Sequence, residues 1–183
     1  HFVVSKLEEA LNSHNLAIIR VFGIGPISTS QDSLWQLALL LHIKEYFGVE
    51  IVTSQDPLTS ELEEEFLQSC GIHVLPPDNL LSTPPSTFPN DFTLLYMIHC
   101  TQDMYENILS SYSNKENVDL QRIILIGNPD DLLSTPPSTF PNDFTLLYMI
   151  HCTQDMYENI LSSYSSKENV DLQRIILIGN FNC

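Results

Sequence analysis

Short apolar runs alternate with segments of helical spacing along most of this chain. Aliphatic runs bounded by glycine, proline or polar clusters predict buried strands, whereas apolar residues three or four positions apart predict helices packed on one side. In the first half of the chain the predicted strands are residues 16–23, 49–53 and 72–75, and the predicted helices are residues 2–12, 33–47 and 61–70.

Polar residues and glycines mark the ends of the two later helices. Ser30 or Asp32 precedes residues 33–47 and Gly48 follows them, in the positions that N-caps and C-cap glycines occupy. Thr59 or Ser60 opens the helix of residues 61–70. Both helices are therefore predicted to end where the apolar periodicity ends.

The helix predicted for residues 61–70 carries both apolar and acidic side chains. We expect the apolar positions Leu62, Phe66 and Leu67 to face inward. The acidic positions are interpreted as a solvated face whose charge favours the N-terminal turn. These positions are Glu61, Glu63, Glu64 and Glu65.

The last part of the chain contains one unit twice. Residues 77–128 and 129–180 align without a gap at an offset of 52 and differ only at Asn79/Asp131 and Asn114/Ser166. Each copy reads as strand, helix and strand, and the first copy places them at residues 92–100, 102–113 and 120–127. Solenoids need at least three repeats. A recent tandem duplication, or an artefact in assembling the coding sequence, therefore explains the near identity better than a functional two-repeat design.

The alternation of strands and helices predicts an α/β fold, a Rossmann-like three-layer domain with a mainly parallel sheet. Residues 1–128 should form this domain, with a leading helix within 1–15 and a proline-rich loop at 76–91. The first copy of the repeated unit should fill the place beside the third strand, because its shorter connection closes at a lower entropic cost. The duplicated unit, residues 129–183, should extend the sheet edge or dock loosely.

The chain is strongly acidic. Its 183 residues include 23 acidic and 7 basic side chains, a net charge of −16. The second copy supplies seven of the acids and two of the bases, so the acidity does not depend on the duplication. This charge repels phosphate backbones and argues against direct nucleic-acid binding. With no apolar run of 18 residues, we also expect no membrane partner. Because the chain begins at His1 and not at Met, we interpret it as a fragment.

The cysteines Cys70, Cys100, Cys152 and Cys183 have no CxxC or paired spacing. Neither a disulfide framework nor a metal site is predicted from them. Reduced thiols are typical of intracellular proteins. We therefore expect the protein in the cytoplasm, or in both the cytoplasm and the nucleus.

Small and polar residues follow the predicted strands at their carboxyl ends, where ligands bind in open parallel sheets. The G-x-G turn at Gly23 and Gly25 lets the backbone approach a ligand, and the following helix N-terminus favours an anion. Asp56 follows the second strand, where dinucleotide-binding folds place a ribose-binding carboxylate. The candidate cofactor-binding rim consists of Gly23, Gly25, Ser28, Thr29, Asp56, His99, Cys100 and Asn128.

The dinucleotide motif is incomplete at this rim. Ser28 stands where the third glycine of G-x-G-x-x-G belongs, and Asp56 lies 31 residues beyond Gly25, whereas the motif places its acid about 20 residues on. A tight turn followed by a helix cap is the structural alternative. The cofactor, if one binds, is unknown.

His99 and Cys100 are adjacent in a predicted strand, so their side chains point to opposite faces and do not form a dyad with each other. Cys100 is either a reactive thiol near a helix N-terminus or a small buried side chain. His99 is either an acid–base group or ligand, or a histidine hydrogen-bonded at the strand end. We assign no catalytic residue.

Ordered motifs along the chain resemble the Sensitivity to Red-light Reduced (SRR-like) domain family. The resemblance spans about residues 16–128, and Ile98 departs from it, because the family usually has proline there. The motifs that carry the resemblance are VFGIGPISTSQDSLWQLALLLHIKE at 21–45, QDP at 55–57, GIHVL at 71–75, YMIHC at 96–100, YEN at 105–107 and IGN at 126–128.

The resemblance implies a Rossmann-like domain with a regulatory role and no assigned reaction, linked to circadian-clock input and to regulation of haem biosynthesis. Under this resemblance, the candidate binding partners are another protein and a nucleotide or haem-related ligand. The alternative function is that of a nucleotide- or cofactor-binding enzyme, a transferase or oxidoreductase, that uses the strand-end rim.

Overall fold

The computed structural model describes residues 2–76, 91–98, 100–113, 122–127, 146–148 and 176–178. Strands and helices alternate from α1 to β3 and again from β4 to β5, as the apolar pattern predicts. In chain order the elements are α1 (Phe2–Leu11), β1 (Leu16–Phe22), α2 (Gln31–Phe47), β2 (Ile51–Gln55), α3 (Glu61–Ser69), β3 (His73–Val74), β4 (Phe92–Met97), α4 (Gln102–Ser113), β5 (Ile123–Gly127), β6 (Leu146–Tyr148) and β7 (Ile176–Ile178).

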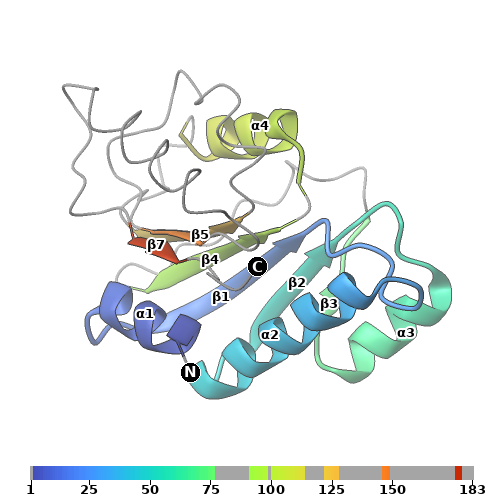
Figure 1. The fold of residues 1–183 in the computed structure, drawn as a ribbon, viewed down its shortest axis with the longest axis horizontal. Coiled ribbons are helices and arrows are strands. Elements are labelled where there is room, and N and C mark those ends of the chain that lie inside the picture. The colour runs from blue at the N-terminus through green and yellow to red at the C-terminus, as the bar shows by residue number, and fades with distance from the viewer. Residues whose placement is uncertain are drawn as a thin grey trace.

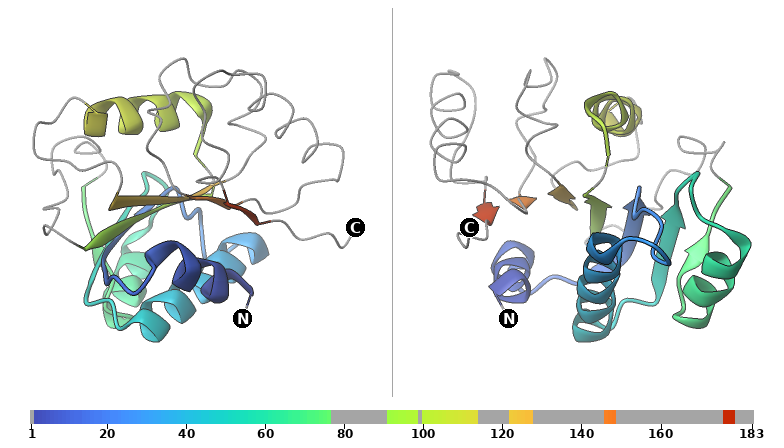
Figure 2. Two further views of the ribbon diagram at one scale, coloured as in Figure 1. Left: turned by 90° about the vertical axis from the view of Figure 1, so that its left-hand side faces the viewer. Right: turned by 45° about the vertical axis from the view of Figure 1, so that its right-hand side comes forward.

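The strands form one sheet in the order β3-β2-β1-β4-β5-β6-β7, and every described pair is parallel. Helices α1, α2 and α3 lie on one face of the sheet and α4 lies on the other (Figures 1 and 2). The predicted α/β fold with a parallel sheet between helical layers is confirmed for the described residues.

The expected place of the first repeat copy was wrong. Strand β4 pairs with β1, with Ile19 opposite Leu94, whereas β3 stays at the edge of the sheet. The chain runs outward from β1 to β3 and then returns to the other side of β1. Because parallel crossovers are right-handed, this reversal puts α4 on the face opposite α2 and α3, so both apolar faces of the sheet are covered.

The second copy contributes β6 and β7, which occupy the same positions in the repeat as residues 94–96 and 124–126. Strand β6 pairs with β5, and β7 pairs with β6, so these two short strands extend the sheet edge. The rest of residues 129–183 lies outside the described residues. The division of the chain at residue 128 stays a prediction.

The main apolar core lies between the sheet and helices α1, α2 and α3. Ile19 of β1, Leu40 of α2 and Leu94 of β4 have no exposed side-chain surface. Helix α2 has the predicted caps: the Ser30 hydroxyl accepts from the Ser33 amide at 3.3 Å, and Gly48 adopts the left-handed conformation at φ 63°. Leu37, Leu40 and Ile43 lie on its buried side, whereas Leu34 and Trp35 are exposed.

Helix α3 faces the sheet with a different side from the one that we expected. Leu67 is buried as predicted, but Leu62 is 73% exposed and Phe66 is 49% exposed, while Glu63 is buried at 5%. Residues 63 and 67 share a helix face because they are four positions apart. The expectation that Leu62 and Phe66 face inward, and that Glu63 is solvated, was wrong. Glu63 faces inward because its carboxylate accepts hydrogen bonds from the amides of Ser28 and Ser60.

Candidate functional site

The sheet reverses its winding between β1 and β4, and the carboxyl ends of these two strands form the place where open α/β sheets bind ligands. Four of the rim residues predicted from sequence meet there. Gly23 and Gly25 follow β1, Asp56 follows β2 and Cys100 follows β4. His99 and Asn128 lie outside the described residues, so their predicted place at the rim stays a prediction.

The turn after β1 is tied to the end of β2. Gly23 and Gly25 both have left-handed backbone angles, φ 63° and 80°, which glycine adopts without the steric cost that a Cβ brings. The Gly23 amide donates to the Gln55 carbonyl at 3.2 Å, and the Gly25 amide donates to Asp56 Oδ2 at 2.6 Å. Asp56 Oδ1 accepts from the Leu58 amide at 2.8 Å. The buried Asp56 carboxylate therefore holds two turns together.

A second carboxylate accepts from the same loop further along. The Ser28 amide donates to Glu63 Oε1 at 2.8 Å, across 35 residues of sequence. Glu63 Oε2 accepts from the Ser60 amide at 2.9 Å and from the Ser60 hydroxyl at 2.8 Å. The Glu63 amide in turn donates to Ser60 Oγ at 3.4 Å, and the two amide contacts form a capping box at the start of α3. The donors to the carboxylate, with the Ser60 and Ser28 amides foremost, lower the pKa of Glu63 from 4.5 to about 2.

The rest of the loop is a turn that leads into α2. The amides of Thr29 and Ser30 both donate to the Pro26 carbonyl, at 3.2 and 2.9 Å, and Ser30 then caps the helix. The predicted rim residues Ser28 and Thr29 thus use their amides within the protein. Together with Gly25, the loop has at least four amide groups that are already hydrogen-bonded to carboxylates or carbonyls of this chain.

Cys100 is fully buried at the switch point. Its Sγ donates to the Phe22 carbonyl at 3.3 Å, which links the end of β4 to the end of β1. Of the two readings of Cys100, a small buried side chain agrees with this position. Solvent does not reach the thiol in this arrangement.

A tyrosine packs against the carboxyl ends of β4 and β5. The hydroxyl of Tyr105, on α4, donates to the Met97 carbonyl, and this hydroxyl also lies against Gly127, which pairs with Met97 in the sheet. A side chain at position 127 would collide with the tyrosine ring. The sequence motifs at 96–97, 105 and 127 therefore meet in one packing contact.

Three polar residues near the rim were not assigned these contacts from the sequence. Arg20 is buried in β1 and donates to Gln55 Oε1 at 2.9 Å, and Gln55 Nε2 donates to the Pro76 carbonyl at 3.1 Å. Arg20 was detectable as the single charge in an apolar strand. Glu63 was detectable as the last residue of the S-x-x-E pattern of a capping box. Gln55 was visible as the first residue of the QDP motif.

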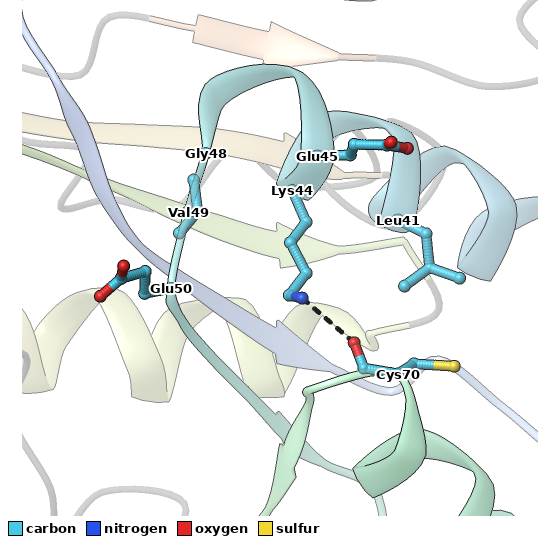
Figure 3. Close-up of a pocket in the computed structure, with 7 residues that line it drawn as sticks. All are labelled: Leu41, Lys44, Glu45, Gly48, Val49, Glu50 and Cys70. Atoms are coloured by element: carbon cyan, nitrogen blue, oxygen red, sulfur yellow. Dashed lines mark hydrogen bonds between the residues drawn. The ribbon is translucent and has the colours of Figure 1, made fainter.

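Two surface depressions lie at the opposite end of the sheet, near the amino ends of β2 and β3. One, of about 570 Å³, lies between the ends of α2 and α3, and there Lys44 Nζ donates to the Cys70 carbonyl at 3.1 Å (Figure 3). This cation satisfies a carbonyl at the C-terminus of α3, where positive charge is favourable. The other, of about 670 Å³, lies beside Ile51 and His73. Neither depression includes a predicted rim residue.

Within the described ranges, no group of three or more His, Cys, Asp or Glu side chains is arranged to hold a metal ion. In the same part of the chain, no helix combines the length and the apolar character that crossing a membrane requires.

Comparison with known proteins places the chain in a family. The SRR1 domain model matches residues 3–135. An SRR1-like protein of Drosophila melanogaster is 26% identical over 137 residues, which cover 75% of this chain and 47% of that protein. The chain thus spans about half the length of this curated relative. No solved structure matches the chain significantly. The resemblance seen in the sequence motifs is confirmed, and the chain belongs to the SRR1 domain family.

Proposed function

We propose that this chain is a non-enzymatic regulatory protein that acts by binding a protein partner. As its family resemblance implies, the processes that it regulates are circadian-clock input and haem biosynthesis. We place it in the cytoplasm, or in both the cytoplasm and the nucleus. The observation that carries the proposal is the occupation of the loop amides after β1 by carboxylates of the chain itself.

Phosphate-binding loops of this fold direct free backbone amides and a helix N-terminus at the ligand. Here Asp56 Oδ2 and Glu63 Oε1 accept from the amides of Gly25 and Ser28. An incoming phosphate would have to displace two charge-assisted hydrogen bonds, each worth about 1.5–3 kcal/mol, and would meet two negative charges. The loop is therefore better suited to supporting the fold than to holding a nucleotide.

The buried thiol supports the same proposal. A nucleophilic cysteine must reach its substrate as a thiolate, whereas Cys100 is fully buried and its Sγ donates to a backbone carbonyl. This contact gives Cys100 a structural part to play between β1 and β4.

Ligand binding tests the non-enzymatic part of the proposal. The full chain would be heated with NAD, NADP, S-adenosylmethionine or ATP, and its unfolding followed by circular dichroism. A ligand present at 100 times its Kd and bound only to the folded state adds about 2.7 kcal/mol of stability. We expect no stabilisation by any of the four. Stabilisation that disappears in Gly25→Val would overturn the proposal in favour of a cofactor-binding enzyme.

Complementation tests the regulatory part. In cells that lack this protein, the level of haem precursors and the period of a clock reporter would be measured after returning wild type or Cys100→Ala. We expect both proteins to restore both readouts, because the thiol does no chemistry. A folded Cys100→Ala protein that fails to restore them, or a wild type that changes neither readout, would contradict the proposal.

A further inference from the structure

Three large apolar side chains are exposed at four-residue intervals along α3 and the turn before it. Leu58 is 65% exposed, Leu62 is 73% exposed and Phe66 is 49% exposed. Single exposed apolar residues are common on protein surfaces, whereas a patch of exposed apolar side chains marks an interaction surface. We name these residues the α3 apolar stripe.

The outward position of the stripe follows from the anchoring of α3. Glu63 accepts from Ser28 of the loop after β1 and from Ser60 at the start of the helix, so position 63 must face the rim and the sheet. Leu67, one turn later, is buried on the same side. With positions 63 and 67 fixed inward, positions 62 and 66 are rotated toward solvent. A polar anchor, and not a lack of apolar residues, keeps the stripe out of the core.

Negative charge borders the stripe. Glu61 and Glu65 are exposed on the same helix. The chain has no lysine or arginine between Lys44 and Lys115, so no positive side chain from this part of the sequence offsets these carboxylates. The surface therefore combines an apolar centre with an acidic border.

We infer that the α3 apolar stripe is a docking surface for a positively charged amphipathic segment of a partner protein. Apolar side chains of that segment would cover Leu62 and Phe66, and its lysines or arginines would meet Glu61 and Glu65. Amphipathic helices bind to such surfaces through apolar residues at helical spacing. The inference deepens the proposed function and rests on it, because it locates the partner of the regulatory protein.

The negative charge of this chain argues against a second copy of the chain and against a membrane as the partner of the α3 apolar stripe. A second copy of this chain would bring an identical acidic border against the first in a symmetric dimer, and like charges placed opposite each other are unfavourable. An anionic membrane surface would repel a chain of net charge −16. A basic partner is the occupant whose charge complements both the border and the whole chain.

A designed peptide tests the surface with the full chain. The probe is a fluorescent amphipathic helix of leucine and lysine, and its binding is measured by anisotropy at about 0.15 M salt. Two further peptides replace its lysines by glutamate or its leucines by glutamine. We expect only the leucine–lysine peptide to bind well, because the surface demands both apolar contact and positive charge.

Two variants separate the stripe from other exposed apolar residues. Leu62→Gln with Phe66→Gln should raise the Kd of the leucine–lysine peptide about ten-fold or more, since truncating apolar anchors removes most of the binding energy of such contacts. The matched control is Leu34→Gln with Trp35→Gln on α2, where the native side chains are 43% and 68% exposed. This control should leave the Kd unchanged.

A second pair of variants tests the acidic border. Glu61→Gln with Glu65→Gln should weaken binding and reduce its dependence on salt. Glu45→Gln with Glu50→Gln, which removes two exposed carboxylates elsewhere, should do so much less.

Three results would overturn the inference. In the first, the stripe variant and the α2 control bind the peptide equally well. In the second, the leucine–glutamate peptide binds as tightly as the leucine–lysine peptide. In the third, sedimentation shows a dimer of the wild type that the stripe variant abolishes, which would make a second copy the occupant. Stabilisation by a nucleotide would refute the proposed function without changing the peptide measurements, so the two failures are distinguishable.

Discussion

Helices α2 and α3 cover the same face of the sheet but are held on it differently. Helix α2 buries the apolar residues Leu37, Leu40 and Ile43 against the strands. Helix α3 buries only Leu67 and the carboxylate of Glu63. The first helix is held mainly by apolar packing, and the second mainly by hydrogen bonds to one charged side chain.

This difference has consequences for the surface of each helix. In α2 the inward side carries Leu37, Leu40 and Ile43, and the hydrophobic effect stabilises it in proportion to the area removed from water. In α3 the hydrogen bonds of Glu63 decide it, so Leu62 and Phe66 are left exposed although they are large and apolar. In α3 the amphipathic pattern therefore does not predict the orientation, because a buried polar contact competes with it.

The largest expected effect is on the apolar anchor of α2. Leu40→Ala removes a fully buried side chain and should lower the free energy of unfolding by about 2–5 kcal/mol, measured by urea denaturation. Leu34→Ala on the same helix is the control, since Leu34 is 43% exposed and should cost far less. Equal costs for the two variants would show that α2 is not held by its buried side.

A smaller but substantial effect is expected at the polar anchor of α3. Glu63→Gln keeps the shape of the side chain but turns an amide NH₂ group toward one of the backbone donors, Ser28 or Ser60. We expect the free energy of unfolding to fall by about 1–3 kcal/mol, the cost of leaving a buried donor unsatisfied. Glu65→Gln, on the exposed side, is the control and should be nearly neutral. A neutral Glu63→Gln would remove the distinction between the two helices.

The same anchor gives the stability of α3 a dependence on pH. The pKa of Glu63 is lowered from 4.5 to about 2, so its ionised form stabilises the fold above about pH 4.5. As the pH falls from there toward 2, the unfolded state takes up the proton first, and this stability is lost.

Urea midpoints of wild type and Glu63→Gln, measured between pH 7 and about pH 2, test this dependence. We expect the wild-type advantage to be constant down to about pH 4.5 and to shrink below it. Other carboxylates titrate in both proteins, so the difference between the two isolates Glu63. A difference that does not change with pH would mean that the carboxylate charge is not what anchors the helix.

The smallest effect is expected on the outer side of α3. Leu62→Gln with Phe66→Gln should change the free energy of unfolding by no more than about 0.5 kcal/mol per site, because both side chains are exposed already. Leu67→Ala on the inner side provides the contrast, with an expected cost of about 2–5 kcal/mol. If the outer variant destabilised the protein as much as the inner one, the stripe would be part of the core and not a docking surface.

Much of the fold was predictable because its signals are local. The spacing of apolar residues located β1, α2 and α4, and the short side chain of Ser30 and the glycine at Gly48 marked the ends of α2. At the candidate site, the G-x-G turn was visible as residues 23–25, and Asp56 was named as a carboxylate that would lie near it. A glycine turn and an apolar run are both signals that neighbouring residues carry.

Other features required contacts between distant parts of the chain. The place of β4 beside β1 depends on how crossovers cover both faces of the sheet, and no short stretch of sequence records it. The role of Asp56 as an acceptor for the Gly25 amide spans 31 residues. Sequence reasoning could name these residues as neighbours at the rim but not the hydrogen bonds that they make there.

Sequence by itself determined the order of strands and helices, the candidate caps of α2 and α3, the family and the near-identical repeat of residues 77–128. Only the tertiary structure decided the rotation of α3. That rotation depends on the free energy of one buried carboxylate, which is low because an amide of Ser28, 35 residues away, donates to it. A periodic pattern carries no information about such a donor, because the donor belongs to another element and meets the helix only after folding.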